Sequence, residues 1–188
     1  DRSVERLDAA QAGRPDAMGT RTKLTLYEGM GGLQENAFIN IKNTSSLFTA
    51  DIIVPAKANG VIVAMGGKFG GYSLYLVNGV PMFTYNWVGK TQYDIKATKA
   101  LTPGKHTIAF KFDYDGGGLG KGGNGTFLID GAEAGKGRID KTNANMFSLD
   151  EGADVGVDEA TAVSKNYKIG RANEFKGKIE QVTIEKLK

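Results

Sequence analysis

Aromatic and amide side chains gather around the single tryptophan of the chain. Tyr85, Asn86 and Trp87 are consecutive, and Tyr93 follows shortly after them. Sugars bind aromatic rings through their apolar C–H faces, while a few placed polar groups fix their hydroxyls. These four residues therefore predict a carbohydrate-binding platform. The alternative interpretation is that the rings pack in the core or at a domain interface, as aromatic side chains of strands usually do.

A second group of residues suited to chemistry is acidic. Asp150, Asp154 and Asp158 lie in one short segment together with Glu151 and Glu159. Calcium takes about six to eight oxygen ligands, and three carboxylates from one loop would supply some of them. The order of an EF-hand loop is absent, and the alternative is a solvated rim with Val155 and Val157 pointing inward from a short strand. Calcium is the one cofactor that the sequence suggests.

The segment 115–125 reads DGGGLGKGGNG and has the glycine content of a phosphate-binding loop. A Walker motif needs Ser or Thr after its Gly-Lys pair, and a helix must follow. Here Gly122 follows Lys121, and the flanking segments have strand patterns. We therefore expect a hairpin loop that uses positive φ angles, with a ligand-contacting or inter-domain loop as the alternative.

Nucleophilic catalysis and thiolate metal sites find little support in the residue types. The chain has no cysteine and one histidine, His106, which follows a Pro-Gly turn. A Ser-His-Asp triad needs its histidine in a cleft, and a zinc site of the usual kind needs more His or Cys ligands. We expect His106 to be an exposed residue at the end of a strand.

Length and charge restrict the partners. The 188 residues are those of one domain, and the net charge of +3 is too small to indicate nucleic-acid binding. No apolar run reaches the roughly 18 residues of a membrane-spanning helix, so no membrane partner is predicted. Residues 1–20 are polar with spaced Gly and Pro, and they predict a linker or docking arm. Residues 21–188 then form a single domain.

The remaining pattern is almost entirely that of strands. Alternating or β-branched runs are separated by turn signals, and the Asn78-Gly79 and Asp130-Gly131 pairs predict tight hairpins. Strands are expected over 24–26, 38–41, 47–54, 60–65, 72–77, 80–87, 106–114, 126–129, 132–139 and 178–187. This spacing predicts an all-β, two-sheet antiparallel β-sandwich of the jelly-roll type, with twelve or more strands.

Several strings of the chain resemble a known family. They are GGKFGGYSLYLVNG, HTIAFKFDYDGGGLGKGG, GTFLIDG, SLDEGADVGVDEATAVS and FKGKIEQVTIEK, after an opening RLDAAQAGRPDAMG. In this order they resemble the C-terminal region of bacterial arylsulfatases over nearly the whole chain. The final strand, the DG hairpin and the GGYSLY segment also resemble the laminin-G or concanavalin-A-like lectin superfamily.

The arylsulfatase resemblance implies an accessory role without catalysis. The Cys/Ser-x-Pro-x-Arg motif that yields formylglycine is absent, since no Ser is followed two positions later by Pro. The resemblance thus implies a non-catalytic domain that packs on a sulfatase catalytic domain, in the same or a companion chain, in the periplasm or outside the cell. The alternative is a free-standing lectin-like module that binds glycans. A glycanase with paired carboxylates is a third reading, for which no carboxylate pair is recognisable.

Overall fold

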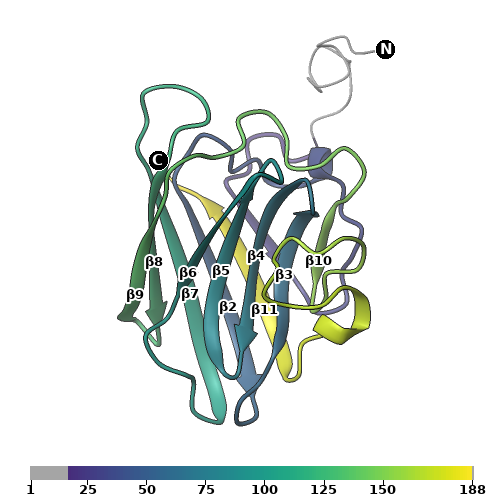
Figure 1. Cartoon of the computed structure of the whole chain (residues 1–188), viewed down its shortest axis with the longest axis vertical. Coiled ribbons are helices and arrows are strands. Elements are labelled where there is room, and N and C mark those ends of the chain that lie inside the picture. Colours follow the sequence, from purple (N-terminus) through teal and green to yellow (C-terminus); the bar gives the residue numbers. More distant parts are fainter. Residues whose placement is uncertain (1–16, 188) are drawn as a thin grey trace.

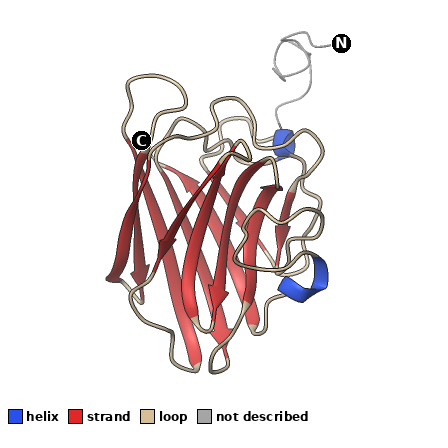
Figure 2. Cartoon of the chain, viewed as in Figure 1, coloured by secondary structure: helices blue, strands red, loops and turns tan. Residues whose placement is uncertain are grey.

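The computed structural model describes residues 17–187, and they form two antiparallel sheets packed face to face (Figures 1 and 2). One sheet has six strands in the order β1-β11-β2-β7-β8-β9, and the other has five in the order β10-β3-β4-β5-β6. The strands are β1 (Lys23–Leu26), β2 (Ser46–Val54), β3 (Gly60–Gly67), β4 (Gly70–Val77), β5 (Val80–Trp87), β6 (Thr91–Lys96), β7 (Gly104–Tyr114), β8 (Gly123–Ile129), β9 (Ala132–Ile139), β10 (Ala153–Val155) and β11 (Lys178–Lys186). The only helices of the described part are two 3-10 turns, η1 (Glu35–Ala37) and η2 (Gly170–Asn173). The predicted jelly-roll β-sandwich is confirmed.

The hairpins form where the turn dipeptides predict them. Asn78 and Gly79 have φ angles of 50° and 81° between β4 and β5, and Asp130 and Gly131 have 51° and 85° between β8 and β9. Positive φ at both central residues matches the right-handed twist of the flanking strands. These turns fix the register, which pairs Val77 with Val80 in the first hairpin.

Alternate side chains of each strand fill the space between the sheets. Phe48 and Ile52 of β2 are buried to 1% and 0% exposure, while outward Ile53 is 38% exposed. Rings from both sheets meet at the centre, where Phe83 of β5 stacks on Phe110 of β7 with 3.9 Å between centroids. This contact joins the two sheets directly.

Glycines bring the two sheets together along one edge. A Cβ on Gly125 would lie 2.4 Å from Cζ of Phe110, and one on Gly137 would lie 2.9 Å from Cγ1 of Ile95. The missing side chains let β8 and β9 approach β6, and the N–H of Thr98 donates to the carbonyl of Ala134 at 2.6 Å. The sandwich is therefore closed at this edge.

A segment after β10, residues 156–168, crosses the outer face of the five-stranded sheet; we call it the strap. Val163 of the strap packs with Val61, Ala64 and Tyr75 in a small second core. The hydroxyl of Tyr75 lies 3.1 Å from Oγ of strap residue Ser164. The strap thus buries a sheet face that would otherwise be open.

Three expectations need correction or qualification. Residues 38–41 form no strand, although Phe38 and Ile39 are buried to 3% and 4%: the chain runs irregularly after η1, so burial rather than pairing explains their apolar pattern. Residues 17–187 contain eleven strands, not twelve or more.

The predicted arm, residues 1–20, lies mostly outside the described residues, and Met18 within it packs against the core. No helix over residues 17–187 is long and apolar enough to cross a bilayer.

Candidate functional site

The turns at the end of the sandwich that is uppermost in Figure 1 form the candidate site. The β3–β4 turn carries Lys68 and Phe69, and the β5–β6 turn runs from Val88 to Lys90. The two turns touch, since a Cβ on Gly89 would lie 3.1 Å from the carbonyl oxygen of Lys68. The segment after β9 joins them, because the side chain of Lys141 reaches Trp87. We call the surface formed by Lys68, Phe69, Trp87, Val88, Lys90, Tyr93 and Lys141 the rim.

Trp87 lies at the end of β5, where the strand leaves the core. Its ring is half-buried, and the ammonium of Lys141 lies over it, 4.8 Å from the ring centroid. Phe69 has a similar arrangement, with Nζ of Lys68 at 5.8 Å from its ring centroid and 73% of the residue exposed. A cation over a ring face is attracted by the ring quadrupole, so both ammonium groups are held near the aromatic surface.

Tyr93 remains at the rim beside Trp87. It pairs with Tyr85 across β5 and β6 and is the diagonal neighbour of Trp87 on the same face. Desolvation, and then the nearby charge of Asp140, raise the pKa of Tyr93 above its ordinary value. Two of the four residues predicted for a sugar platform are thus brought together at a half-exposed position.

Tyr85 is part of the core instead. It is 8% exposed, its hydroxyl accepts a hydrogen bond from the N–H of Asn143 at 2.8 Å, and its ring meets Phe147. Burial raises the pKa of Tyr85 well above the usual value for tyrosine. The side chain is therefore a support for the 140–147 segment and cannot reach a ligand.

Asn86 faces away from the other three residues and is fully buried beneath the strap. Its amide nitrogen donates to the carbonyl oxygens of Gly67 and Lys68 at 3.0 Å and of Val163 at 3.3 Å. Its Oδ1 accepts from the N–H of Gly89 at 3.0 Å. One side chain therefore ties together the β3–β4 turn, the β5–β6 turn and the strap, so Asn86 positions the rim and does not itself face a ligand.

The three aspartates of the predicted calcium site serve separate local roles. Asp154 accepts from the N–H of Gly32 at 2.7 Å, and Asp150 is exposed. Asp158 is buried, and its Oδ2 accepts from the N–H of Val163 at 2.9 Å and the hydroxyl of Tyr167 at 2.6 Å. Over residues 17–187 no group of three or more acidic or histidine side chains is arranged to hold a metal ion. Calcium binding at these aspartates stays a prediction from the sequence.

Burial without a cationic partner changes the acidity of Asp158. Desolvation raises its pKa to about 6, and the charges of Asp154 and Glu151 add to the rise. The hydrogen bonds from Tyr167 and Val163 act in the opposite direction but are outweighed. Asp158 is thus a buried carboxylate at the foot of the strap.

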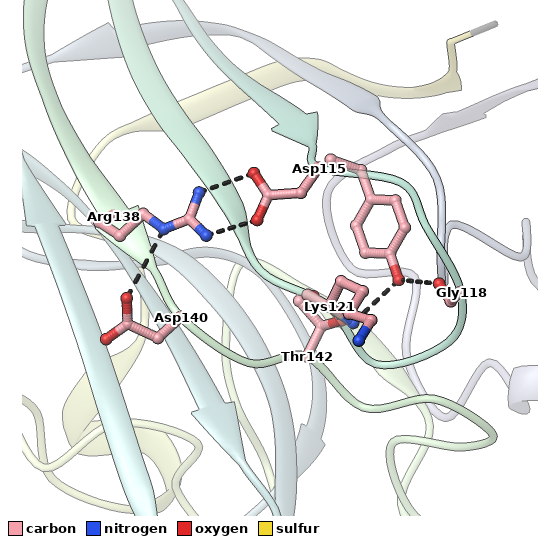
Figure 3. Close-up of polar contacts among 7 residues, drawn as sticks. Asp115, Gly118, Lys121, Arg138, Asp140 and Thr142 are labelled. Atoms are coloured by element: carbon pink, nitrogen blue, oxygen red, sulfur yellow. Dashed lines mark hydrogen bonds and ion pairs between the residues drawn. The ribbon is translucent and has the colours of Figure 1, made fainter.

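The glycine-rich loop between β7 and β8 has a defined structure (Figure 3). Its Gly116, Gly117, Gly118 and Gly120 have positive φ angles, which confirms the expected conformation. The hydroxyl of Tyr114 donates to the carbonyl of Gly118 at 2.6 Å and accepts from the N–H of Lys121 at 2.9 Å. At the start of the loop, Arg138 forms a two-pronged ion pair with Asp115. These contacts hold the loop together, and strands flank it on both sides.

His106 is more enclosed than expected. Its side chain is 12% exposed, with Nδ1 2.7 Å from Oδ2 of Asp130 and Nε2 2.9 Å from the carbonyl oxygen of Thr102. It faces a groove of about 320 Å³ at the opposite end of the sandwich, lined by Thr98, Lys99, Ala100, Leu101, Thr102, His106, Ile129, Ala132, Glu133 and Ala134. No Phe, Tyr or Trp lines this groove, so it lacks the stacking surface that the rim has.

Comparison with known proteins places the fold but not a family. No family model matches the chain, and no curated protein matches it. Among solved structures, it is similar to the CBM40 domain of the Ruminococcus gnavus IT-sialidase bound to α2,6-sialyllactose, with a TM-score of 0.57, 14% identity, and coverage of 89% of this chain and 93% of that one. The same domain with α2,3-sialyllactose gives a TM-score of 0.57 and 14% identity, over 89% and 92% of the two chains. Domains LG4-5 of the mouse laminin α1 chain give 0.52 and 16%, over 88% and 42%. These likenesses show a laminin-G-like jelly roll.

Sequence reasoning missed the basic half of the rim. Lys68 and Phe69 come from another hairpin, and Lys141 lies far from Trp87 along the chain. Turn dipeptides and period-two alternation are local signals, so neither shows which distant loops meet. The local signal in this region is Phe69-Gly70, a large apolar side chain beside a glycine, because an exposed apolar group can mark an interaction site.

Proposed function

We propose that this chain is a lectin-like carbohydrate-binding module whose ligand stacks on Trp87 at the rim. The observation that carries the proposal is the half-buried Trp87 ring, placed beside Tyr93 at a strand end and bordered by polar side chains. An aromatic face surrounded by a few fixed polar groups is the usual composition of a sugar site. The fold shared with a sialyllactose-bound domain supports the same class of ligand. We assign the chain a binding role and no catalytic step.

The single tryptophan makes the test direct. Titration with lactose, cellobiose, chitobiose and acidic oligosaccharides should change the fluorescence of Trp87 in a saturable way for at least one of them. Calorimetry on the same panel gives the affinity independently of the fluorophore. Trp87→Leu should weaken that binding at least about tenfold, whereas Tyr27→Leu, at an exposed aromatic residue away from the rim, should leave it unchanged. Absence of binding to every sugar of the panel would refute the proposal.

The second candidate is the accessory domain of a bacterial arylsulfatase, which the sequence resemblance suggests. No comparison links the chain to a sulfatase, but one observation favours docking to a larger partner. Phe69, Leu119 and Leu149 belong to loops at the uppermost end of the sandwich and are 73%, 68% and 72% exposed. Exposed apolar side chains at one end are typical of a protein interface. Under this reading the chain works in the periplasm or outside the cell.

Co-purification separates the two candidates. A catalytic sulfatase fragment should capture the chain, and Leu119→Ser with Leu149→Ser should reduce the capture, if the accessory reading holds. Unchanged glycan binding by the same double variant would show that the module acts by itself.

A further inference from the structure

The three lysines of the rim have no carboxylate partner. Nζ of Lys68, Lys90 and Lys141 forms no ion pair with any carboxylate over residues 17–187, and all three residues are exposed. Two carboxylates beside the rim have other partners: Oδ1 of Asp140 lies 3.6 Å from Nε of Arg138, which also pairs with Asp115, and Glu151 accepts from the hydroxyl of Thr161. The single charge of Asp140, which acts on Tyr93, faces three lysines of the rim. The rim is therefore a cationic surface around an aromatic ring.

The outer face of the six-stranded sheet is built differently. There Lys105 pairs with Glu180 at 2.7 Å, and Lys111 pairs with Asp113 at 2.7 Å. The positive charge on that face is balanced by neighbouring carboxylates. At the rim, by contrast, the lysine ammonium groups form no ion pair with a carboxylate and are available to bind an incoming anion.

The position of Lys141 matters most, because its exposed ammonium lies over one face of the half-buried Trp87 ring, 4.8 Å from the centroid. A sugar can stack on the ring only if this ammonium moves aside, which its long and flexible stem allows. A neutral sugar that stacks on the ring displaces the ammonium, and the favourable energy of the cation–ring contact is lost. A sugar with a negative substituent recovers it, since the displaced ammonium lies at the edge of the ring beside that substituent.

We infer that the rim selects sugars that bear an anionic substituent, a sulfate ester or a carboxylate, with Lys141 as the residue that sets the selectivity. This inference rests on the proposed function and on the same site. Lys68 and Lys90 add attraction from the two neighbouring turns, and screening by salt weakens all three contributions.

Calorimetric titrations with lactose, 3′-sulfolactose and 3′-sialyllactose test the inference at low and high salt. We expect both acidic sugars to bind roughly tenfold tighter than lactose at low salt, and we expect added salt to reduce this preference. A preference for one acidic sugar over the other identifies sulfate or carboxylate as the preferred group.

The variant Lys141→Ala gives the decisive comparison. It should weaken binding of the acidic sugars and tighten binding of lactose, because the ring face is then open. A purely structural defect would weaken all three sugars together. Lys99→Ala, at an exposed lysine of the opposite end, is the matched control and should change nothing.

The outcomes separate the two claims. Equal affinity for lactose and the acidic sugars, or an acidic preference that survives Lys141→Ala, overturns the inference and leaves the proposed function intact. Binding of no sugar at all overturns both. An acidic preference that disappears in Lys141→Ala, with lactose binding retained, supports both.

Discussion

Replacing the buried Asp158 by Asn should make the protein more stable at neutral pH and remove part of its pH dependence. Both hydrogen bonds that Asp158 receives end on Oδ2, so an asparagine Oδ1 in the same place keeps its acceptor role for Val163 and Tyr167. What the substitution removes is a carboxylate held away from water without a cation. The native hydrogen bonds at the foot of the strap therefore remain, and the charge is lost.

The magnitude follows from the pKa of Asp158, which burial raises from 3.8 to about 6. A difference of about 2 in pKa corresponds to about 3 kcal/mol between the charged and protonated forms. Below pH 4 the group is protonated in both folded and unfolded chains, and it imposes no penalty. Above pH 6 it is charged in both, and the folded state bears the full penalty. The stability contributed by protonated Asp158 is thus lost as the pH rises from about 4 to 6.

Urea unfolding of wild type and Asp158→Asn at a series of pH values measures this effect. The gain in unfolding free energy of the variant should grow from near zero at pH 4 to about 3 kcal/mol at pH 7. Asp150→Asn, at an exposed position of the neighbouring segment, should show a much smaller change. A gain that is the same at pH 4 and pH 7 would refute the reasoning.

Two further substitutions test the packing. Gly125→Ala should destabilise the fold by about 1–3 kcal/mol, because the added Cβ meets the ring of Phe110; Asn124→Ala, which faces outward on the same strand, should cost little, and urea unfolding compares the two. Asn86→Ala should cost about 1–3 kcal/mol by leaving buried carbonyls without a donor. Hydrogen exchange should then quicken at Gly89, and protection of that amide equal to wild type would contradict the role of Asn86.

The hairpins were predictable from the sequence, but the order of the strands in each sheet was not. Asn78-Gly79 and Asp130-Gly131 act locally, and the backbone conformation that they favour does not depend on the rest of the chain. The pairing of β1 with β11 joins Lys23 to Glu185, and nothing in either strand encodes that partner. Residues 38–41 illustrate a different limit, since an apolar run shows burial without showing whether the backbone is paired.

About half of the candidate site was predictable from the sequence. Period-two alternation places Asn86 on the opposite face from Tyr85 and Trp87, so the separation of the amide from the rings follows from strand geometry. What the pattern does not show is that Tyr85 lies inside the core while Trp87 lies beyond it, because that depends on where the covering 140–147 segment ends. The approach of Lys141 to Trp87 depends on the same segment and has no sequence signal.

The position of β11 between β1 and β2 has a consequence for how the chain acquires its structure. Among the strands of residues 17–187, β1 pairs with β11 alone, and one side of β2 is covered by β11. During synthesis from the N-terminus, the other five strands of this sheet are made before β11. The growing chain carries an open hydrogen-bonding edge on β2 in that interval, and a chaperone or a pairing error with another nascent chain has its opportunity there. Docking of β11 is therefore also the step that covers the open edge of β2.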